Sequence, residues 1–147
     1  MLLSFETGLV KTSHYDPEMR QLADRHYSRQ TVGAKQFSGC GRKLVLRNHE
    51  GTVLFIWIFQ NYRRDKQTGF NCSLFRNESA RLSSEIILEA EQLAVEKWGA
   101  GRAFTFIDSK KIQSANPGYC FKVAGWKRVG YSERHAKIIL EKFLTRK

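Results

Sequence analysis

The chain has 147 residues, of which 41% are hydrophobic and 27% charged, a length and composition typical of one globular domain spanning residues 1–147. It carries 25 lysine and arginine residues against 14 aspartate and glutamate residues, a formal net charge of +11. The longest apolar run, Val53 to Phe59, is far shorter than the ~20 residues of a membrane span, and the first residues lack the regions of a signal peptide, so we expect a cytoplasmic protein with no membrane partner.

The first predicted elements are a strand and a short helix. Residues Leu2 to Val10 favour a strand. Asp16-Pro17-Glu18 is typical of a helix start, because Asp caps well, Pro fits the first position and an acid suits the first turn. The helix has an apolar face at i, i+3, i+4 and i+7, formed by Met19, Leu22, Ala23 and His26. The pattern ends there, and Ser28 to Gly41 reads as a loop of a length that is usually functional or disordered.

Three strands and a long helix are predicted next. The strands are Lys43–Leu46, Thr52–Gln60 and Phe70–Phe75, and the turn-rich segment Asn48 to Gly51 joins the first two as a hairpin. Ser83 and Ser84 begin the helix, which ends before Gly99. Its apolar stripe comprises Ile86, Ile87, Ala90, Leu93, Ala94 and Trp98.

The C-terminal part adds a short buried strand, Ala103–Ile107, that ends at Asp108. A short helix follows Pro117, and strands are predicted near Lys127–Tyr131 and Ala136–Phe143, although the last segment suits a helix equally well. The predicted order, β-α-β-β-β-α-β-α-β-β, indicates an α/β (α+β) domain with a mixed sheet and helices on its faces.

Positive charge is unevenly distributed. Arg25 to Asn48 holds six basic residues and no acid, Lys97 to Ser132 holds seven with a single acid, and Ser83 to Glu96 holds four acids and no base. Such segregation predicts a basic face, which attracts a polyanion. It favours a nucleic-acid partner over a role in solubility alone. The candidate contacts are Arg25, Arg29, Lys35, Arg42, Lys110 and Lys111.

The three cysteines, Cys40, Cys72 and Cys120, lie far apart in the sequence without a CxxC pair. A sparse, odd set argues against a disulfide framework and against a thiolate zinc site. We expect a reducing compartment and buried thiols, with a catalytic thiol as the alternative.

The segment Asn116 to Trp126 resembles an element of the GNAT (N-acetyltransferase-like) fold, in which a short helix ends in an aromatic residue, three residues, glycine and an aromatic residue. The element order resembles that fold over nearly the whole chain. The resemblance implies a mostly antiparallel sheet with helices on both faces and an acetyl-CoA-type donor. Two departures are visible: the tyrosine that protonates the leaving thiolate falls on Phe121, with Tyr119 nearest, and the glycine-rich pyrophosphate loop is replaced by Arg76 to Ser83.

A helix N-terminus still offers N–H groups to an anion. The residues that we expect to bind the donor are therefore Arg76, Arg81 and Ser83, together with Ser73 on the strand where GNAT proteins spread two strands to admit the cofactor.

A narrower resemblance is to the Mom family of phage DNA-modification proteins, a divergent GNAT-like group. It rests on Arg25 to Arg29 with the basic loop that follows, on Asn71 to Arg76, and on Phe106-Ile107-Asp108 followed by Tyr119. The family converts adenine in DNA to an N6-carbamoylmethyl (acetamido) form that shields phage DNA from restriction enzymes. The resemblance implies catalytic roles for His26, Tyr27, Asp108 and Tyr119.

Each catalytic candidate has a structural alternative. His26 can exchange a proton or ligate a metal, or it can close its helix. Tyr27 can stack on a base or belong to the core. Asp108 can act as a base or metal ligand, or form a salt bridge with Lys110 or Lys111. Because no HxxxH, HExxH or carboxylate cluster occurs, a metal site, with iron as the candidate, requires residues such as His26 and Asp108 to meet in space.

The leading hypothesis is an enzyme that modifies adenine in double-stranded DNA with a group from an acyl-type donor. It requires a base turned out of the duplex, and the aromatic candidates for stacking are Phe37, Trp57, Phe59 and Tyr62. The alternatives are a GNAT acetyltransferase acting on a small amine or protein, and a non-catalytic nucleic-acid-binding module.

Overall fold

A computed structural model describes residues 8–26, 41–60, 63, 65–109, 116, 118–132 and 137–146 of the chain. Its elements, in chain order, are β1 (Leu9–Thr12), α2 (Pro17–Asp24), β2 (Arg42–Asn48), β3 (Val53–Phe59), β4 (Phe70–Asn77), α3 (Ser83–Trp98), β5 (Gly101–Ile107), α4 (Tyr119–Val123), β6 (Lys127–Tyr131) and β7 (Ile138–Leu144). Their order confirms the predicted sequence of elements, and the last segment, for which a helix was the alternative, is a strand.

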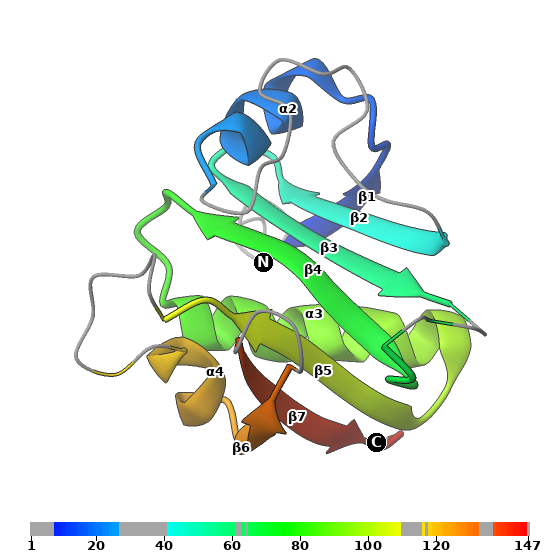
Figure 1. The fold of residues 1–147 in the computed structure, drawn as a ribbon. Coiled ribbons are helices and arrows are strands. Elements are labelled where there is room, and N and C mark those ends of the chain that lie inside the picture. Colours follow the sequence, from blue (N-terminus) through cyan, green and yellow to red (C-terminus); the bar gives the residue numbers. More distant parts are fainter. Residues whose placement is uncertain are drawn as a thin grey trace.

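The strands form one seven-stranded sheet in the order β1-β2-β3-β4-β5-β7-β6. All neighbouring pairs are antiparallel except β4 and β5, which run parallel. The α3 helix makes the crossover between these two strands (Figure 1). The α+β class, with a mixed and mostly antiparallel sheet, is therefore confirmed.

The helices cover opposite faces of the sheet, as expected (Figure 1). The α2 helix begins at Pro17 because the Asp16 side chain accepts hydrogen bonds from the backbone N–H groups of Glu18 and Met19. Its buried face packs on β2, β3 and β4 in a smaller core, formed by Met19, Leu22, Ala23, Val45, Leu54, Ile56, Ile58 and Leu74.

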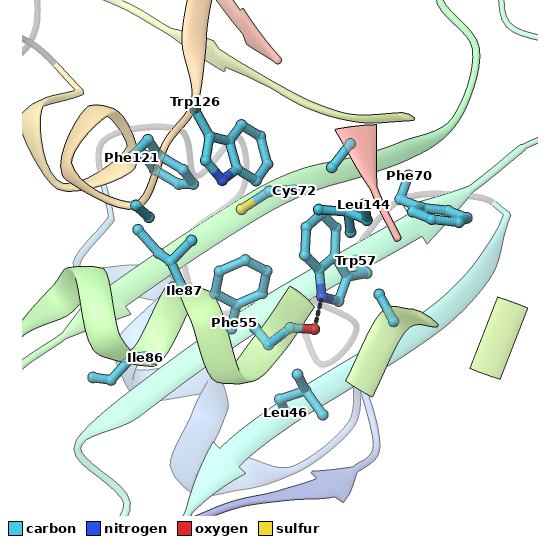
Figure 2. Close-up of a cluster of buried hydrophobic side chains, with 14 of the residues drawn as sticks. Leu46, Phe55, Trp57, Phe70, Cys72, Ile86, Ile87, Phe121, Trp126 and Leu144 are labelled. Carbon is cyan, nitrogen blue, oxygen red and sulfur yellow. Dashed lines mark hydrogen bonds between the residues drawn. The ribbon is translucent and has the colours of Figure 1, made fainter. Parts of the chain in front are cut away.

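The larger core lies under α3 on the other face. Phe55 and Trp57 on β3 point toward this helix, and the Trp57 indole N–H donates a hydrogen bond of 2.9 Å to the Ala90 carbonyl (Figure 2). Phe121 of α4 and the nearby Trp126 complete the cluster (Figure 2). The two cores fix the sheet from both sides, so that strand positions are set by packing as well as by hydrogen bonds.

One buried carboxylate joins α3 to the C-terminal part of the sheet. Glu91, 6% exposed, accepts hydrogen bonds from the Trp126 indole N–H at 2.9 Å and from the Lys142 ammonium at 2.7 Å. Lys142 also donates to the Ala124 carbonyl at 2.8 Å. A buried charge of this kind is tolerated because it is paired and hydrogen-bonded.

Among the described helices, none has both the length and the apolar character that a bilayer crossing demands.

We predict that Glu91→Leu lowers the free energy of unfolding by about 2–3 kcal/mol, because it leaves the Trp126 N–H without an acceptor and the Lys142 ammonium without its carboxylate. The double variant Glu91→Leu/Lys142→Met should recover part of this loss, since no buried charge is then left unpaired. Urea unfolding of the three proteins measures both effects. A single variant as stable as the parent would contradict the prediction.

Candidate active site

The parallel strands β4 and β5 pair over only three residues. Their register is Phe70↔Ala103, Asn71↔Phe104 and Cys72↔Thr105, and it ends there. At the next position β4 has a β-bulge against β3. The adjacent β3 residues Trp57 and Ile56 pair with Cys72 and Leu74, which are two positions apart on β4. Ser73 is the additional residue of this bulge. A bulge bends its strand and interrupts pairing, so β4 leaves β5 directly after Cys72.

A cavity of about 490 Å³ lies where the strands separate. Its volume falls in the usual range for small-molecule sites. Its lining residues are His26, Asn71, Cys72, Ser73, Leu74, Phe75, Thr105, Phe106, Ile107, Asp108, Asn116, Gly118, Tyr119, Cys120, Phe121 and Lys137. Three of the four expected catalytic residues and one expected donor-binding residue, Ser73, therefore meet in one cavity.

Asp108 and Tyr119 reach this cavity from its β5 and α4 walls. Asp108 is the first residue after β5, as the sequence indicates, and is half-buried. Tyr119 is the first residue of α4 and is 62% exposed. The preceding Gly118 has φ +76°, and a Cβ atom there would lie 2.7 Å from Leu140 Cδ1. Only glycine fits this position comfortably, so Gly118 helps to set where Tyr119 stands.

Phe121 lies on the core side of α4. It is 5% exposed, and its ring centroid is 5.0 Å from that of Trp126. Phe121 has no ionisable proton and serves the larger core. Tyr119, in contrast, carries a phenol hydroxyl group and lines the same cavity.

His26 enters the cavity from the end of α2. Its backbone N–H donates to the Ala23 carbonyl at 3.0 Å, and its side chain interacts with the backbone of Phe75 in β4. Burial, and then the positive charge of Arg76, lower the pKa of the imidazole to about 4, although the hydrogen bond with Phe75 opposes this shift. His26 is therefore uncharged at neutral pH, and its ring binds a strand rather than only closing its own helix.

The other expected donor-binding residues have partners in the fold. Arg76 lies 3.0 Å from a carboxylate oxygen of Glu78, and Arg81 lies 2.9 Å from one of Glu89. The Ser83 hydroxyl accepts a hydrogen bond from the Asn77 side chain at 3.0 Å. None of the three lines the cavity. A diphosphate would have to displace two carboxylates, and no glycine occurs in residues 76–83, so this loop does not fit the pyrophosphate of an acetyl-CoA-type donor.

The two metal candidates, His26 and Asp108, line the same cavity. Across the described ranges, however, no three side chains of the His, Cys, Asp or Glu type come close enough to hold one ion. The residues that the structure describes therefore do not supply the ligand set expected for iron.

The structure describes two of the residues that we expect to bind nucleic acid, Arg25 and Arg42. Arg25 binds Glu78 through two hydrogen bonds of 2.8 and 2.9 Å, and the Arg42 guanidinium lies 4.6 Å from the centroid of the Phe59 ring. The other candidates of this kind, Arg29, Lys35, Lys110 and Lys111, lie outside the described residues, and so does the fourth expected catalytic residue, Tyr27.

The two expected stacking residues that the structure describes, Trp57 and Phe59, do not line the cavity. Trp57 is fully buried under α3, and Phe59 packs against the same core, whereas Phe37 and Tyr62 lie outside the described residues. The aromatic rings that do reach the cavity are Phe75, Phe106, Tyr119 and Phe121.

The cysteine prediction can be assessed for two of the three residues. Cys72 is buried and Cys120 half-buried, and both are free thiols. Burial raises the pKa of both thiols above the ordinary value, which is the environment of an unreactive cysteine. Cys40 lies outside the described residues.

Sequence reasoning did not identify Asn71 and Lys137 as cavity residues. Asn71 is the first residue of the segment Asn71 to Arg76 that carries the family resemblance, but it was given no role there, and Lys137 precedes β7. Their position in the cavity depends on strand register, for which the sequence carries no local signal.

No protein-family model matches the chain, and no curated protein matches it.

We predict that His26 makes stability depend on pH between about 6.5 and 4. Its pKa is lower in the folded than in the unfolded protein. The contribution of the neutral imidazole to folding stability is therefore complete above pH 6.5 and is lost as the pH falls toward 4. The loss should reach about 2–3 kcal/mol. Thermal unfolding of the parent and His26→Phe at several pH values measures this, since the variant should lose less stability across that window. Parallel curves for both proteins would refute the assignment.

Proposed function

We propose that the protein is a DNA-adenine modification enzyme of the Mom type, which converts adenine to its N6-carbamoylmethyl form and so protects DNA from restriction. The observation that supports it most is the meeting of His26, Asp108 and Tyr119 in one cavity. These residues come from three separate elements and are the positions at which the sequence resembles that family. The net charge of +11 supports a polyanionic substrate.

The cavity suits chemistry on a base taken out of the duplex. The exposed Tyr119 is one of its lining residues, and its surface is mostly apolar. Extruding a base costs a few kcal/mol, which stacking and edge contacts in a closely fitting pocket recover. Phe75, Phe106 and Phe121 supply the apolar surface for such contacts.

The three polar residues then have separate roles. Adenine N6 is a poor nucleophile because its lone pair is delocalised into the ring, and it must lose a proton when it forms a new bond. The Asp108 carboxylate is the group that accepts this proton. Neutral His26 accepts a hydrogen bond and orients the amine. The donor is a molecule that carries the carbamoylmethyl group on a leaving group. As the bond from N6 to the methylene carbon forms, the bond from that carbon to the leaving group breaks, and the Tyr119 hydroxyl donates a proton to the leaving group.

The alternative is an acetyltransferase that acts on a small amine or a protein. The separation of two parallel strands at the Ser73 bulge favours it, because such a gap admits an extended donor without any need for DNA. Binding of acetyl-CoA with no affinity for DNA would select this function over the proposed one.

Expression of the protein should modify adenine in DNA of the same cell. Nucleosides from a co-resident plasmid, separated and weighed by mass spectrometry, should include N6-carbamoylmethyl-deoxyadenosine, and the plasmid should resist restriction enzymes that cut at adenine-containing sites. The control is the same plasmid beside an empty vector. A digest with only ordinary bases and N6-methyladenine would reject the proposal.

Asp108→Asn should reduce the modified fraction at least about 100-fold, the usual contribution of general acid–base catalysis, while the fold remains intact. Asp65→Asn is the matched control: Asp65 pairs with Arg63 at 2.7 Å and does not line the cavity. Mass spectrometry gives the activity and thermal unfolding the stability. Full activity of Asp108→Asn would place the base elsewhere.

A further inference from the structure

The cavity contains a buried amide with an unsatisfied oxygen. Asn71 is 7% exposed, and within the described chain no group donates a hydrogen bond to its Oδ1 atom. No other buried side-chain nitrogen or oxygen in the described residues lacks a partner. Buried polar atoms without a hydrogen bond are rare because they lower the stability of the folded protein, so each one needs a functional or structural explanation.

Strand pairing explains why Asn71 is unsatisfied. Its neighbours across the sheet are Ile58 on β3 and Phe104 on β5, and neither side chain can donate a hydrogen bond. An apolar residue would suit these neighbours better. Asn71 nevertheless is the middle of the three residues of β4 that pair with β5, and it lines the cavity together with Ser73 of the bulge.

A second buried asparagine shows the ordinary, satisfied arrangement. Asn48, 4% exposed, accepts hydrogen bonds of 2.9 Å from the backbone N–H groups of Thr52 and Val53, and it donates one of 2.8 Å to the Thr52 hydroxyl. Asn48 therefore holds the β2–β3 turn. Asn71 makes no comparable set of bonds, so its amide is available to a ligand.

We infer that Asn71 is the base-reading residue of the cavity and that it recognises the edge of an adenine. This inference rests on the proposed function for the identity of the base. An asparagine amide pairs with adenine through two hydrogen bonds: its oxygen accepts from the N6 amino group and its nitrogen donates to N7. Guanine has an oxygen in place of the amino group, which would face Oδ1 and repel it.

The enclosed position of Oδ1 does not prevent this contact. The last side-chain torsion of asparagine is broad and roughly two-fold, and turning it breaks no hydrogen bond of Oδ1. Turning toward an amino group in the cavity therefore gains a bond without losing one. The amide also holds N6 in the cavity that contains Asp108 and His26, the groups to which the proposed function assigns its proton and its orientation.

Stability separates this role from a structural one. Asn71→Leu removes an unsatisfied polar atom and fills a mostly apolar site, so the melting temperature should rise by about 2–4 °C. The matched control, Asn48→Leu, removes three satisfied hydrogen bonds and should lower it. A melting temperature of Asn71→Leu that falls as that of Asn48→Leu does would make Asn71 structural and overturn the inference.

Ligand binding tests the reading itself. The parent should bind deoxyadenosine monophosphate more tightly than deoxyguanosine monophosphate in ligand-observed NMR titrations, and Asn71→Leu should lose about tenfold or more of its affinity for the former. Equal affinity of parent and variant, or no binding by the parent, would overturn the inference. If binding depends on Asn71 while plasmid adenine stays unmodified, the proposed function fails and the inference stands.

Discussion

The separation of β4 from β5 is the constraint on which the rest of the site depends. A continuous parallel pair would fill the gap with backbone hydrogen bonds and leave no cavity. The additional residue at Ser73 interrupts the alternation of β4, so that Cys72 and Phe75 both face α3 whereas Leu74 faces α2. One inserted residue thus directs neighbouring side chains of β4 into both cores and ends the pairing with β5 at the same point.

Each wall of the cavity is held by its own set of contacts. On one side, the α2 core and the contact of His26 with Phe75 hold the departing part of β4. On the other, Glu91 ties α3 to Trp126 and Lys142, and so fixes α4 and β7. The cavity opens where the two parts of the sheet, which share the core under α3, are hydrogen-bonded along only three residue pairs. Its shape is therefore set by packing and needs no ligand to form.

Local signals predicted the elements well. The capping of α2 by Asp16, the stripe of α3 and the position of Asp108 after β5 all follow from neighbouring residues. Partnerships over long sequence distances did not follow. The pairing of Arg25 with Glu78 spans 53 positions, and the missing partner of Asn71 is a property of two neighbouring strands. Whether a buried polar group finds a hydrogen-bond partner depends on tertiary structure, because it depends on which residues each strand meets across the sheet.

The positive charge of the protein can act on a polyanion in two ways, by long-range attraction and by close contact with phosphate groups, and the ion pairs affect only the second. Attraction of a polyanion acts over about a Debye length, ~10 Å in 0.1 M salt, and depends on the total charge of +11 rather than on single pairs. Close phosphate contact is different, because a phosphate that reaches Arg25, Arg76 or Arg81 must displace a carboxylate. In the described cavity wall, Lys137 is a cation without an ion pair. Under the proposed function, long-range attraction brings the polyanion to the surface, and the cavity, with Lys137 and Asn71, selects the group that enters.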